Sequence, residues 1–477
     1  MLYKIGANTL ASSLGRIIGS AFALVSVALM TRALGAEGFG EYSTVVAYLT
    51  TFQILADLGL YSLFTREISQ NPARERELLG IFFTLRLLAG AFLLALAVVL
   101  VFFFPYSHGV QVGVAFASIG FLAVSLTQLF MGVFQTRVAV YKGAIAEVAG
   151  RAVQLVLVAF FATRGGGLFS FIVALVLSSF VIFFLNLLFA WRIIPFRLSL
   201  PPVEAKRIIR TTLPIAISIV FTLLYFRVDT LMLSVLKGPI EVGLYNGAYK
   251  VLETFIFFPA VLVGLFLPIL SRQAQDDRRA FSRTLSVLAD GILVIVAPLV
   301  VGGVLLSASM VALIGGAEFI PAFLSLAILF GAVGMIFFGT LFGNSVVALN
   351  LQKKSVSVYA IGFVVNFGAN LFVIPRYSYT GAAWTTLGTE LLVTILLALL
   401  VWRAAHFTFS LRAGGGALGA SAFMAFVLWN IYAPWGVALG WFEMVQVVVL
   451  GAFLYSVASL AFIPSLWERA KKLQYQK

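Results

Sequence analysis

The sequence predicts an all-α integral membrane protein with about 14 transmembrane helices. Hydrophobic residues make up 62% of the 477 residues and charged residues only 10%, whereas a soluble domain is about one quarter charged. The mean hydropathy is +1.07. The apolar runs are long enough to cross a bilayer, about 20 residues each, and they lack the alternation of an outer-membrane barrel. We therefore expect a helical bundle that lies in a membrane.

The individual spans follow from the apolar runs and from the turn residues between them. We place them approximately at residues 8–31, 42–65, 80–104, 111–136, 144–163, 168–190, 208–235, 243–270, 284–307, 320–350, 355–374, 380–402, 411–432 and 441–464. The tenth span is too long for one straight crossing. We expect it to be tilted, or broken near Gly339 and Gly343.

The basic residues give the orientation, because cytoplasmic loops retain Lys and Arg. Of the 32 basic residues, 23 fall on one side of the predicted spans. The opposite side holds Arg32, Arg164, Lys237 and Arg376, and five basic residues lie within spans. This asymmetry predicts a multi-pass protein of the plasma or inner membrane with both termini in the cytoplasm. The outer loops are short, which leaves no room for a folded outer domain.

Composition also excludes several classes of function. Cysteine is absent, so the chain has no disulfide framework, thiolate metal site or cysteine nucleophile. The net charge of +14 resides in short loops between apolar spans, which argues against binding to nucleic acid. His108 and His406 are isolated, and no metal-ligand spacing or phosphate-binding loop is present. We expect no metal and no cofactor.

An internal repeat divides the chain into two halves of the same orientation. An ungapped shift of 203 residues superimposes Thr9-Leu10 on Thr212-Leu213, Val25 on Val228, Gly35 on Gly238, Gly40 and Tyr42 on Gly243 and Tyr245, and Leu49 and Phe52 on Leu252 and Phe255. The sequence thus predicts two pseudo-symmetric six-helix bundles, residues 1–191 and 208–403. A basic cytoplasmic linker at 192–207 joins them, and residues 404–477 add two helices and a basic tail.

The seventh and eighth spans form a charged hairpin. Arg227 and Asp229 are two positions apart and point to nearly opposite faces of a continuous helix, whereas Lys250 and Glu253 share one face. Because the two spans are antiparallel around the turn near residue 240, Asp229 is expected level with Lys250, and Arg227 with Glu253. The four residues could form two buried ion pairs that lock the hairpin, or a polar site on a substrate or ion route.

The repeat favours a functional site over a lock. The equivalent positions of the first half are all neutral: Leu24, Ser26, Ala47 and Thr50. Packing alone would not require four charges in one copy only.

Three arginines and one glutamate within the predicted spans are further candidate site residues. Arg16, Arg86 and Arg151 fall near the cytoplasmic ends of spans one, three and five, where each could reach the interface. Together they could instead line a basic vestibule, and guanidinium groups suit phosphate oxygens. Glu390 falls near the membrane midplane, where a carboxylate is either paired or a proton or cation site. Asp57 and Asp290 are expected to anchor helix ends.

Three stretches resemble the polysaccharide-export flippases of the multidrug/oligosaccharidyl-lipid/polysaccharide exporter superfamily. They are TRALGAEGFGEY at 31–42, followed by DLGL at 57–60 and RE at 66–67; Arg227-x-Asp229, followed by VGLY at 242–245 and AYK at 248–250; and NFGANLFVIPRYSYTGAAWTTLGTE at 366–390. Their order and spacing cover nearly the whole chain. The sequence departs from the family in one respect: the arginines of its first half lie near the cytoplasmic end, not deep in a central cavity.

The resemblance implies a flippase that moves polyprenyl- or dolichyl-diphosphate-linked oligosaccharides from the cytoplasmic to the outer leaflet by alternating access. It implies coupling to a Na⁺ or H⁺ gradient, and a groove for the lipid tail at the two extra helices. We expect a monomer that contacts membrane lipids and other polysaccharide-assembly proteins. The candidate diphosphate ligands are Arg227, Lys250, Arg16, Arg86 and Arg151, and the candidate charge-pairing or ion-coupling acids are Asp229, Glu253 and Glu390.

Two other functions remain open at this point. A cation-coupled multidrug exporter of the same superfamily should have an acidic cavity, whereas the five cations within spans favour an anionic substrate. A membrane polysaccharide polymerase or ligase needs a sizeable outer loop with acidic and basic groups. The predicted outer loops are short and nearly uncharged.

Overall fold

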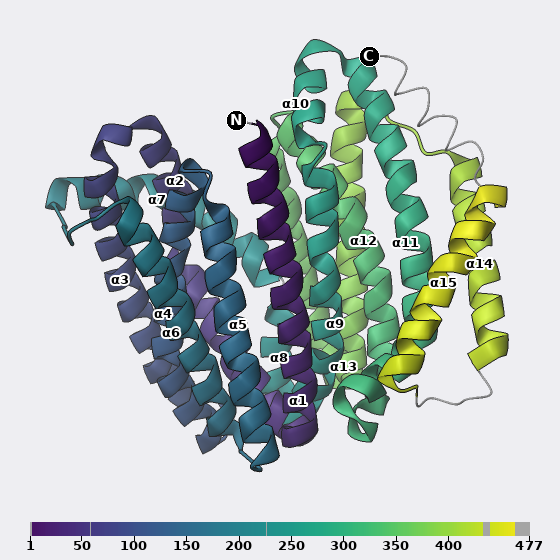
Figure 1. Cartoon of the computed structure of the whole chain (residues 1–477), viewed down its shortest axis with the longest axis horizontal. Coiled ribbons are helices and arrows are strands. Elements are labelled where there is room, and N and C mark those ends of the chain that lie inside the picture. The colour runs from purple at the N-terminus through teal and green to yellow at the C-terminus, as the bar shows by residue number, and fades with distance from the viewer. Residues whose placement is uncertain (1, 58, 226, 433–438, 463–477) are drawn as a thin grey trace. The chain divides into compact units, whose positions relative to one another are not determined.

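A computed structural model shows a chain built of helices (Figure 1). It describes residues 2–57, 59–225, 227–432 and 439–462. The basic residues of the predicted cytoplasmic tail, Arg469, Lys471, Lys472 and Lys477, lie outside these described residues, as does Leu58 of the DLGL stretch. All regular structure in the described part of the chain is helical.

The described residues form α-helices and short 3-10 helices. In chain order they are α1 (Leu2–Asp57), α2 (Leu60–Gln70), η1 (Pro72–Arg74), α3 (Glu75–Leu100), η2 (Val101–Phe103), α4 (His108–Thr136), α5 (Val140–Thr163), α6 (Leu168–Ile193), α7 (Pro202–Tyr225), α8 (Val228–Leu236), α9 (Pro239–Gly264), α10 (Leu267–Asp276), α11 (Arg278–Gly315), η3 (Ala317–Ala322), α12 (Phe323–Ala348), α13 (Gln352–Ala405), α14 (Leu411–Tyr432) and α15 (Trp441–Phe462).

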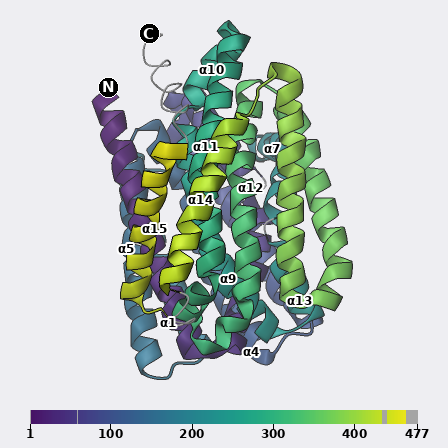
Figure 2. The same cartoon turned by 90° about the vertical axis from the view of Figure 1, so that its right-hand side faces the viewer.

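Eleven helical segments among the described residues are long and apolar enough to cross a membrane. Two helices, α1 and α13, have 56 and 54 residues, about 80 Å if straight, so each is long enough for two crossings. Each contains one non-helical residue, Gly35 (φ 67°) in α1 and Ser378 (φ 50°) in α13. Figure 2 shows α13 folded into two antiparallel arms. The predicted all-α membrane fold is confirmed.

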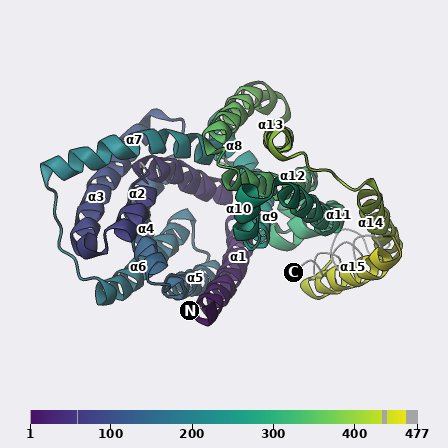
Figure 3. The same cartoon turned by 90° about the horizontal axis from the view of Figure 1, so that it is seen from above.

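The chain folds as two compact units, Met1–Gly243 and Leu244–Lys477. In the first, α4 lies at the centre and packs against α1, α2, α3, α5 and α6 (Figure 3). In the second, α12 packs against α10, α11 and α13, while α14 and α15 cover α11. The predicted division into bundles at 1–191 and 208–403 stays a prediction.

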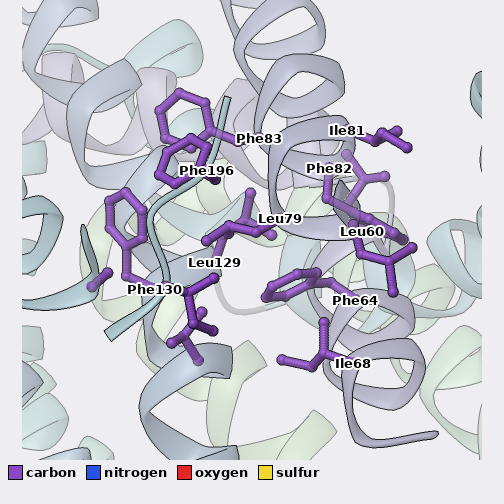
Figure 4. Close-up of a cluster of buried hydrophobic side chains, with 14 of the residues drawn as sticks. Leu60, Phe64, Ile68, Leu79, Ile81, Phe82, Phe83, Leu129, Phe130 and Phe196 are labelled. Atoms are coloured by element: carbon purple, nitrogen blue, oxygen red, sulfur yellow. The ribbon is translucent and has the colours of Figure 1, made fainter. Parts of the chain in front are cut away.

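The segment between α6 and α7 is fixed to the first unit by apolar packing. Phe196 is buried, with its ring centroid 5.2 Å from that of Phe83 and 6.3 Å from that of Phe130 (Figure 4). Gly80 lets the chain approach α3, because a Cβ there would lie 2.1 Å from the Arg197 carbonyl oxygen. Burying one Phe side chain contributes about 1.5–3 kcal/mol. The predicted linker is therefore an ordered part of this unit.

Ion pairs cover the same end of the first unit. The Arg207 guanidinium donates to both carboxylate oxygens of Glu67 (2.7 and 2.9 Å) and to Glu204 (2.7 Å). Arg74 also donates to Glu204, at 3.2 Å. These hydrogen bonds, first from Arg207 and then from Arg74, lower the pKa of Glu204 below its ordinary 4.5. The N-terminus of α7 is thereby attached to α2 and η1.

Two predicted spans differ in detail from the structure. The tenth span was expected to be tilted or broken; α12 runs without interruption from Phe323 to Ala348, so it has no break there and the tilt stays a prediction. Gly339 lies close to α13, because a Cβ there would lie 3.1 Å from Thr394 Oγ1. A Cβ at Gly343 would lie 3.4 Å from the Tyr359 hydroxyl, which is an ordinary van der Waals distance. The seventh span, predicted as one helix over 208–235, is divided into α7 and α8.

Candidate functional site

The division between α7 and α8 places Arg227 at a helix break. Arg227 has non-helical dihedral angles (φ −121°, ψ −13°) and is the N-cap of α8. The first N–H groups of a helix lack partners within the helix, and they give its N-terminus a partial positive charge. At membrane depth, such irregular backbone is tolerated only where it is buried in protein or lines a water-filled cavity.

Asp229 occupies the first turn that follows this break. It is only 4% exposed, and an acidic residue in the first turn of a helix is stabilised by the partial charge of the N-terminus. The sequence-based prediction that Arg227 and Asp229 lie on opposite faces of one helix is thus corrected. Arg227 precedes α8, whereas Asp229 belongs to it.

Lys250 and Glu253 pair with each other on α9. The Lys250 Nζ donates to Glu253 Oε2 at 2.6 Å, and the two side chains are 26% and 27% exposed. Both residues belong to the second unit, whereas Arg227 and Asp229 belong to the first. The predicted pairs Arg227–Glu253 and Asp229–Lys250 therefore stay predictions.

Arg86 lies in an enclosed polar network of the first unit. Its side chain is 0% exposed and pairs with the Asp57 carboxylate. Its Nε donates to Ser125 Oγ (3.1 Å) and its Nη2 to Gln128 Oε1 (2.7 Å). A buried charge is tolerated when it is paired and hydrogen-bonded in this way. In this structure Arg86 neither reaches the interface nor lines an open vestibule, which corrects the expectation for this residue.

The other two arginines of the first half lie on neighbouring helices, α1 and α5. Arg16 is exposed, and Arg151 is half-buried with its Nη1 donating to Gln154 Oε1 at 3.1 Å. The stem of Arg151 passes α1, because a Cβ at Gly19 would lie 3.9 Å from its Cγ. Since Gly19 is one turn from Arg16, the structure brings two of the three predicted vestibule arginines to one helix pair.

A polar seam joins the two arms of α13 in the second unit. Asn366 donates to Thr389 Oγ1 at 3.2 Å, and Asn370 donates to Asn366 Oδ1 at 3.1 Å. Tyr245 of α9 shares a hydrogen bond of 3.1 Å with Thr386, which lies on the same face of α13 as Thr389. Glu390 follows Thr389 and is 5% exposed. The predicted midplane acid is thus buried beside a hydrogen-bonded network.

Two glycines make a reciprocal contact in the first unit. A Cβ at Gly40 would lie 1.7 Å from the Pro239 carbonyl oxygen, and a Cβ at Gly243 would lie 1.9 Å from the Ala36 carbonyl oxygen. The shift of 203 residues maps Ala36 on Pro239 and Gly40 on Gly243. The starts of two repeat-equivalent helical segments therefore touch backbone to backbone, and we call this contact the glycine crossing.

Sequence reasoning missed the glycine crossing, the partners of Arg86 and the seam in α13. The repeated Gly-x-Tyr pattern contained the signal for the crossing, because a glycine at a helix start permits close backbone approach. Asn366 began the third family-like stretch without an assigned role. Ser125 and Gln128 had no signal, since single polar residues in an apolar helix identify no partner.

Comparison with known proteins places the chain in a family. The model of the polysaccharide biosynthesis protein family matches residues 5–274. The chain is 28% identical over 258 residues to the probable flippase AglR of Haloferax volcanii, a match that covers 52% of this chain and 53% of AglR. It is 22% identical over 461 residues to the probable low-salt glycan biosynthesis flippase Agl15 of the same organism, which covers 94% of each chain.

Solved structures show the same fold. The lipid II flippase MurJ, in an inward closed conformation, is similar over 96% of this chain and 99% of its own, with a TM-score of 0.78 and 15% identity. A multidrug resistance transporter of the MATE family in the MOP superfamily is similar over 81% of this chain and 95% of its own, with a TM-score of 0.62 and 15% identity. The chain belongs to the polysaccharide biosynthesis protein family.

Proposed function

We propose that this protein is a flippase of glycan biosynthesis that moves a polyprenyl- or dolichyl-diphosphate-linked oligosaccharide from the cytoplasmic to the outer leaflet. Its family and the names of its relatives AglR and Agl15 support this proposal. The observation that carries it is the helix break at Arg227. A cation and a buried carboxylate at an interrupted membrane helix are typical of a substrate or ion route.

Arg227 and Lys250 bind the lipid diphosphate in this proposal. The guanidinium fork of Arg227 can donate two parallel hydrogen bonds to phosphate oxygens. Lys250 is paired with Glu253 at 2.6 Å, and a diphosphate carries more negative charge than one carboxylate. Lys250 therefore exchanges Glu253 for the diphosphate when the substrate enters, and Asp229 and Glu253 again neutralise the two cations when it leaves.

The remaining predicted site residues divide into three roles. Arg16 and Arg151 attract the diphosphate at the cytoplasmic entrance, because one is exposed and the other half-buried on neighbouring helices. Arg86 stabilises the first unit, because Asp57, Ser125 and Gln128 occupy its guanidinium. Glu390 takes part in coupling to a Na⁺ or H⁺ gradient, since it is buried next to hydrogen-bonded side chains.

In an alternating-access mechanism, the glycine crossing would open and close one end of the transport path. The turn at Gly35 is predicted on the outer side, because α1 begins on the side that the basic residues assign to the cytoplasm. The crossing lies one helical turn beyond this residue. It therefore closes the outer end of the path, and the backbones of the two repeats separate there when the substrate is released.

Transport into vesicles tests this proposal. The protein is reconstituted in liposomes with a fluorescent polyprenyl-diphosphate oligosaccharide, and a membrane-impermeant glycosidase is added outside. The flippase exposes label from the inner leaflet, so that cleavage exceeds the fraction reached in protein-free vesicles. For the variant Arg227→Gln, the matched control is Arg272→Gln, because the Arg272 side chain is 86% exposed. Cleavage equal to that in protein-free vesicles would contradict the proposal.

A cation-coupled drug exporter is the second candidate, because the fold is shared with a MATE transporter and because Asp229 and Glu390 are buried acids. Ethidium uptake into the same vesicles under a Na⁺ or H⁺ gradient distinguishes the two. Ethidium transport without glycolipid transport would favour the exporter.

A further inference from the structure

A basic pocket lies at the start of α11 in the second unit. Its volume is about 660 Å³, and it is lined by Arg278, Arg279, Ser282, Arg283, Ala404, Ala405 and His406. The first four residues come from the first two turns of α11, and the last three from the end of α13 and its C-cap. The pocket therefore lies where two membrane-spanning helices reach the surface, on the side predicted to be cytoplasmic.

The pocket carries excess positive charge. Arg278, Arg279 and Arg283 are all exposed, and Arg278 is oriented by a 3.2 Å hydrogen bond from its Nη1 to the Ala404 carbonyl oxygen. The neighbouring Asp277 caps α11, since its Oδ1 accepts from the backbone N–H groups of Arg279 and Ala280. This carboxylate offsets only part of the charge of the three guanidinium groups.

The wall of the pocket that is formed by the end of α13 and His406 is hydrogen-bonded to α11. The segment after α13, residues 406–410, lies along three α11 side chains spaced four residues apart. Ser282 Oγ donates to the His406 carbonyl oxygen (3.0 Å), Ser286 Oγ accepts from the Thr408 N–H (3.0 Å) and Asp290 Oδ1 accepts from the Ser410 N–H (2.9 Å). These bonds preorganise the pocket.

An apolar stripe on α13 leads into this pocket. Its members are exposed side chains at helical spacing, and they lie at Leu391, Ile395, Leu399 and Trp402. Trp402 is in ring contact with His406, at 5.0 Å between centroids. Residues three and four apart share one helix face, so the stripe is continuous with the pocket wall. Exposed apolar side chains on a membrane-spanning helix face lipid tails, and Trp is enriched at the membrane interface.

We infer that this pocket binds the head group of an anionic phospholipid, with the phosphate on the three arginines and an acyl chain along the α13 stripe. Basic pockets between transmembrane helices on the cytoplasmic side bind anionic lipid head groups, and guanidinium forks match phosphate oxygens. The site is separate from the helix break at Arg227, and it does not depend on the proposed transport function. The stripe favours a lipid over a free anion, because inorganic phosphate cannot use it.

Native mass spectrometry with synthetic lipids tests this inference. The full-length protein, purified in mild detergent, is titrated with phosphatidylglycerol and, separately, with phosphatidylcholine. The pocket variant is Arg278→Gln/Arg279→Gln/Arg283→Gln. The matched control, Arg272→Gln/Lys353→Gln/Lys354→Gln, removes the same charge outside the pocket. Each Arg near an anionic head group contributes to binding, so we expect the pocket variant to bind one phosphatidylglycerol at least about tenfold more weakly than the control.

Two further results decide the nature of the ligand. The variant Ile395→Ser/Leu399→Ser tests the acyl-chain contact, and it should weaken phosphatidylglycerol binding while leaving the arginines in place. Excess inorganic phosphate should displace little lipid. The inference is overturned if the pocket variant and the control bind phosphatidylglycerol equally, if the pocket variant loses phosphatidylcholine to the same extent, or if inorganic phosphate alone displaces the lipid. Thermal unfolding of each variant confirms that it is folded.

Discussion

Two charged regions of the first unit differ in backbone structure, because one lies on a continuous helix and the other lies at a helix break. Arg86 lies on the continuous helix α3, fully enclosed, with Asp57, Ser125 and Gln128 around its guanidinium. Arg227 lies where α7 and α8 are interrupted, and Asp229 follows it in the first turn of α8. The side chains of the first region bond to one another, whereas the second region contains the helix ends of α7 and α8. Burial of a charge alone does not identify a transport site.

The repeat makes the same point. In the first half, the positions equivalent to Arg227 and Asp229 are Leu24 and Ser26. There α1 continues as a helix, and Ser26 Oγ donates to the Phe22 carbonyl oxygen at 2.8 Å. The glycine crossing is common to both halves, but the break and its charges occur in one. The helix break and its two charged residues therefore distinguish the second half of the repeat from the first.

The largest effect is expected at Arg86. Arg86→Gln leaves the Asp57 carboxylate without its cation in a buried network, and breaking such a pair typically costs about 3–5 kcal/mol of folding free energy. Thermal unfolding in detergent, followed by tryptophan fluorescence, should show a strongly lowered midpoint. The double variant Arg86→Met/Asp57→Leu removes both charges and should recover most of the loss. A midpoint unchanged in Arg86→Gln would remove the distinction between the two regions.

The glycine crossing should respond next. Gly40→Ala places a Cβ 1.7 Å from the Pro239 carbonyl oxygen, so the backbones must separate, and overpacking of this kind costs about 1–3 kcal/mol. We expect lower thermal stability and altered transport. Gly291→Ala is the control, because nothing lies within 4 Å of the position that its added methyl group would occupy, and Ala favours a helix over Gly. Equal behaviour of the two variants would show that the crossing is not tight.

Substitution of Asp229 is expected to lower transport much more than it lowers stability. Asp229→Asn removes a charge at a helix N-terminus, an interaction that contributes about 0.3–2 kcal/mol, so the unfolding midpoint should fall only slightly. Glycolipid transport should fall about tenfold, because one of the two proposed diphosphate-binding cations then lacks a neutralising carboxylate when the site is empty. The ratio of transport to folded protein is the relevant measurement. A proportional loss of both would assign Asp229 to folding.

The smallest effect is expected from pH at the ion pairs that join α7 to α2 and η1. The pKa of Glu204 is lowered below 4.5 by hydrogen bonds from Arg207 and then from Arg74, so its contribution to stability is present above that pH and is lost as the pH falls through the lower folded-state value. Hydrogen exchange of residues 202–212 should be slower in wild type than in Glu204→Gln at pH 7. That difference should shrink as the pH falls below 4.5 and vanish once Glu204 is protonated in the folded state. A difference that did not change with pH would contradict this account of the linker.

The sequence predicted the helical class and the span positions because apolar length and turn residues report them directly. It did not predict the break, because the apolar pattern on both sides of Arg227 is the same for one helix or two. Asp229 was a usable signal, since acidic residues favour the first turn of a helix. The pairing of Arg86 with Asp57 was hidden, because the two residues are 29 positions apart and belong to different helices.

Transport by one charge-neutral variant tests the central claim most directly. Arg227→Gln, Asp229→Asn, Lys250→Gln and Glu253→Gln are combined in one chain, and its rate of glycolipid transport per folded molecule is compared with that of wild type. We predict at least about a tenfold loss of transport with an unfolding midpoint close to that of wild type, because the four charges serve the substrate. Intact transport with a clearly lowered midpoint would show instead that the four residues only lock the hairpin.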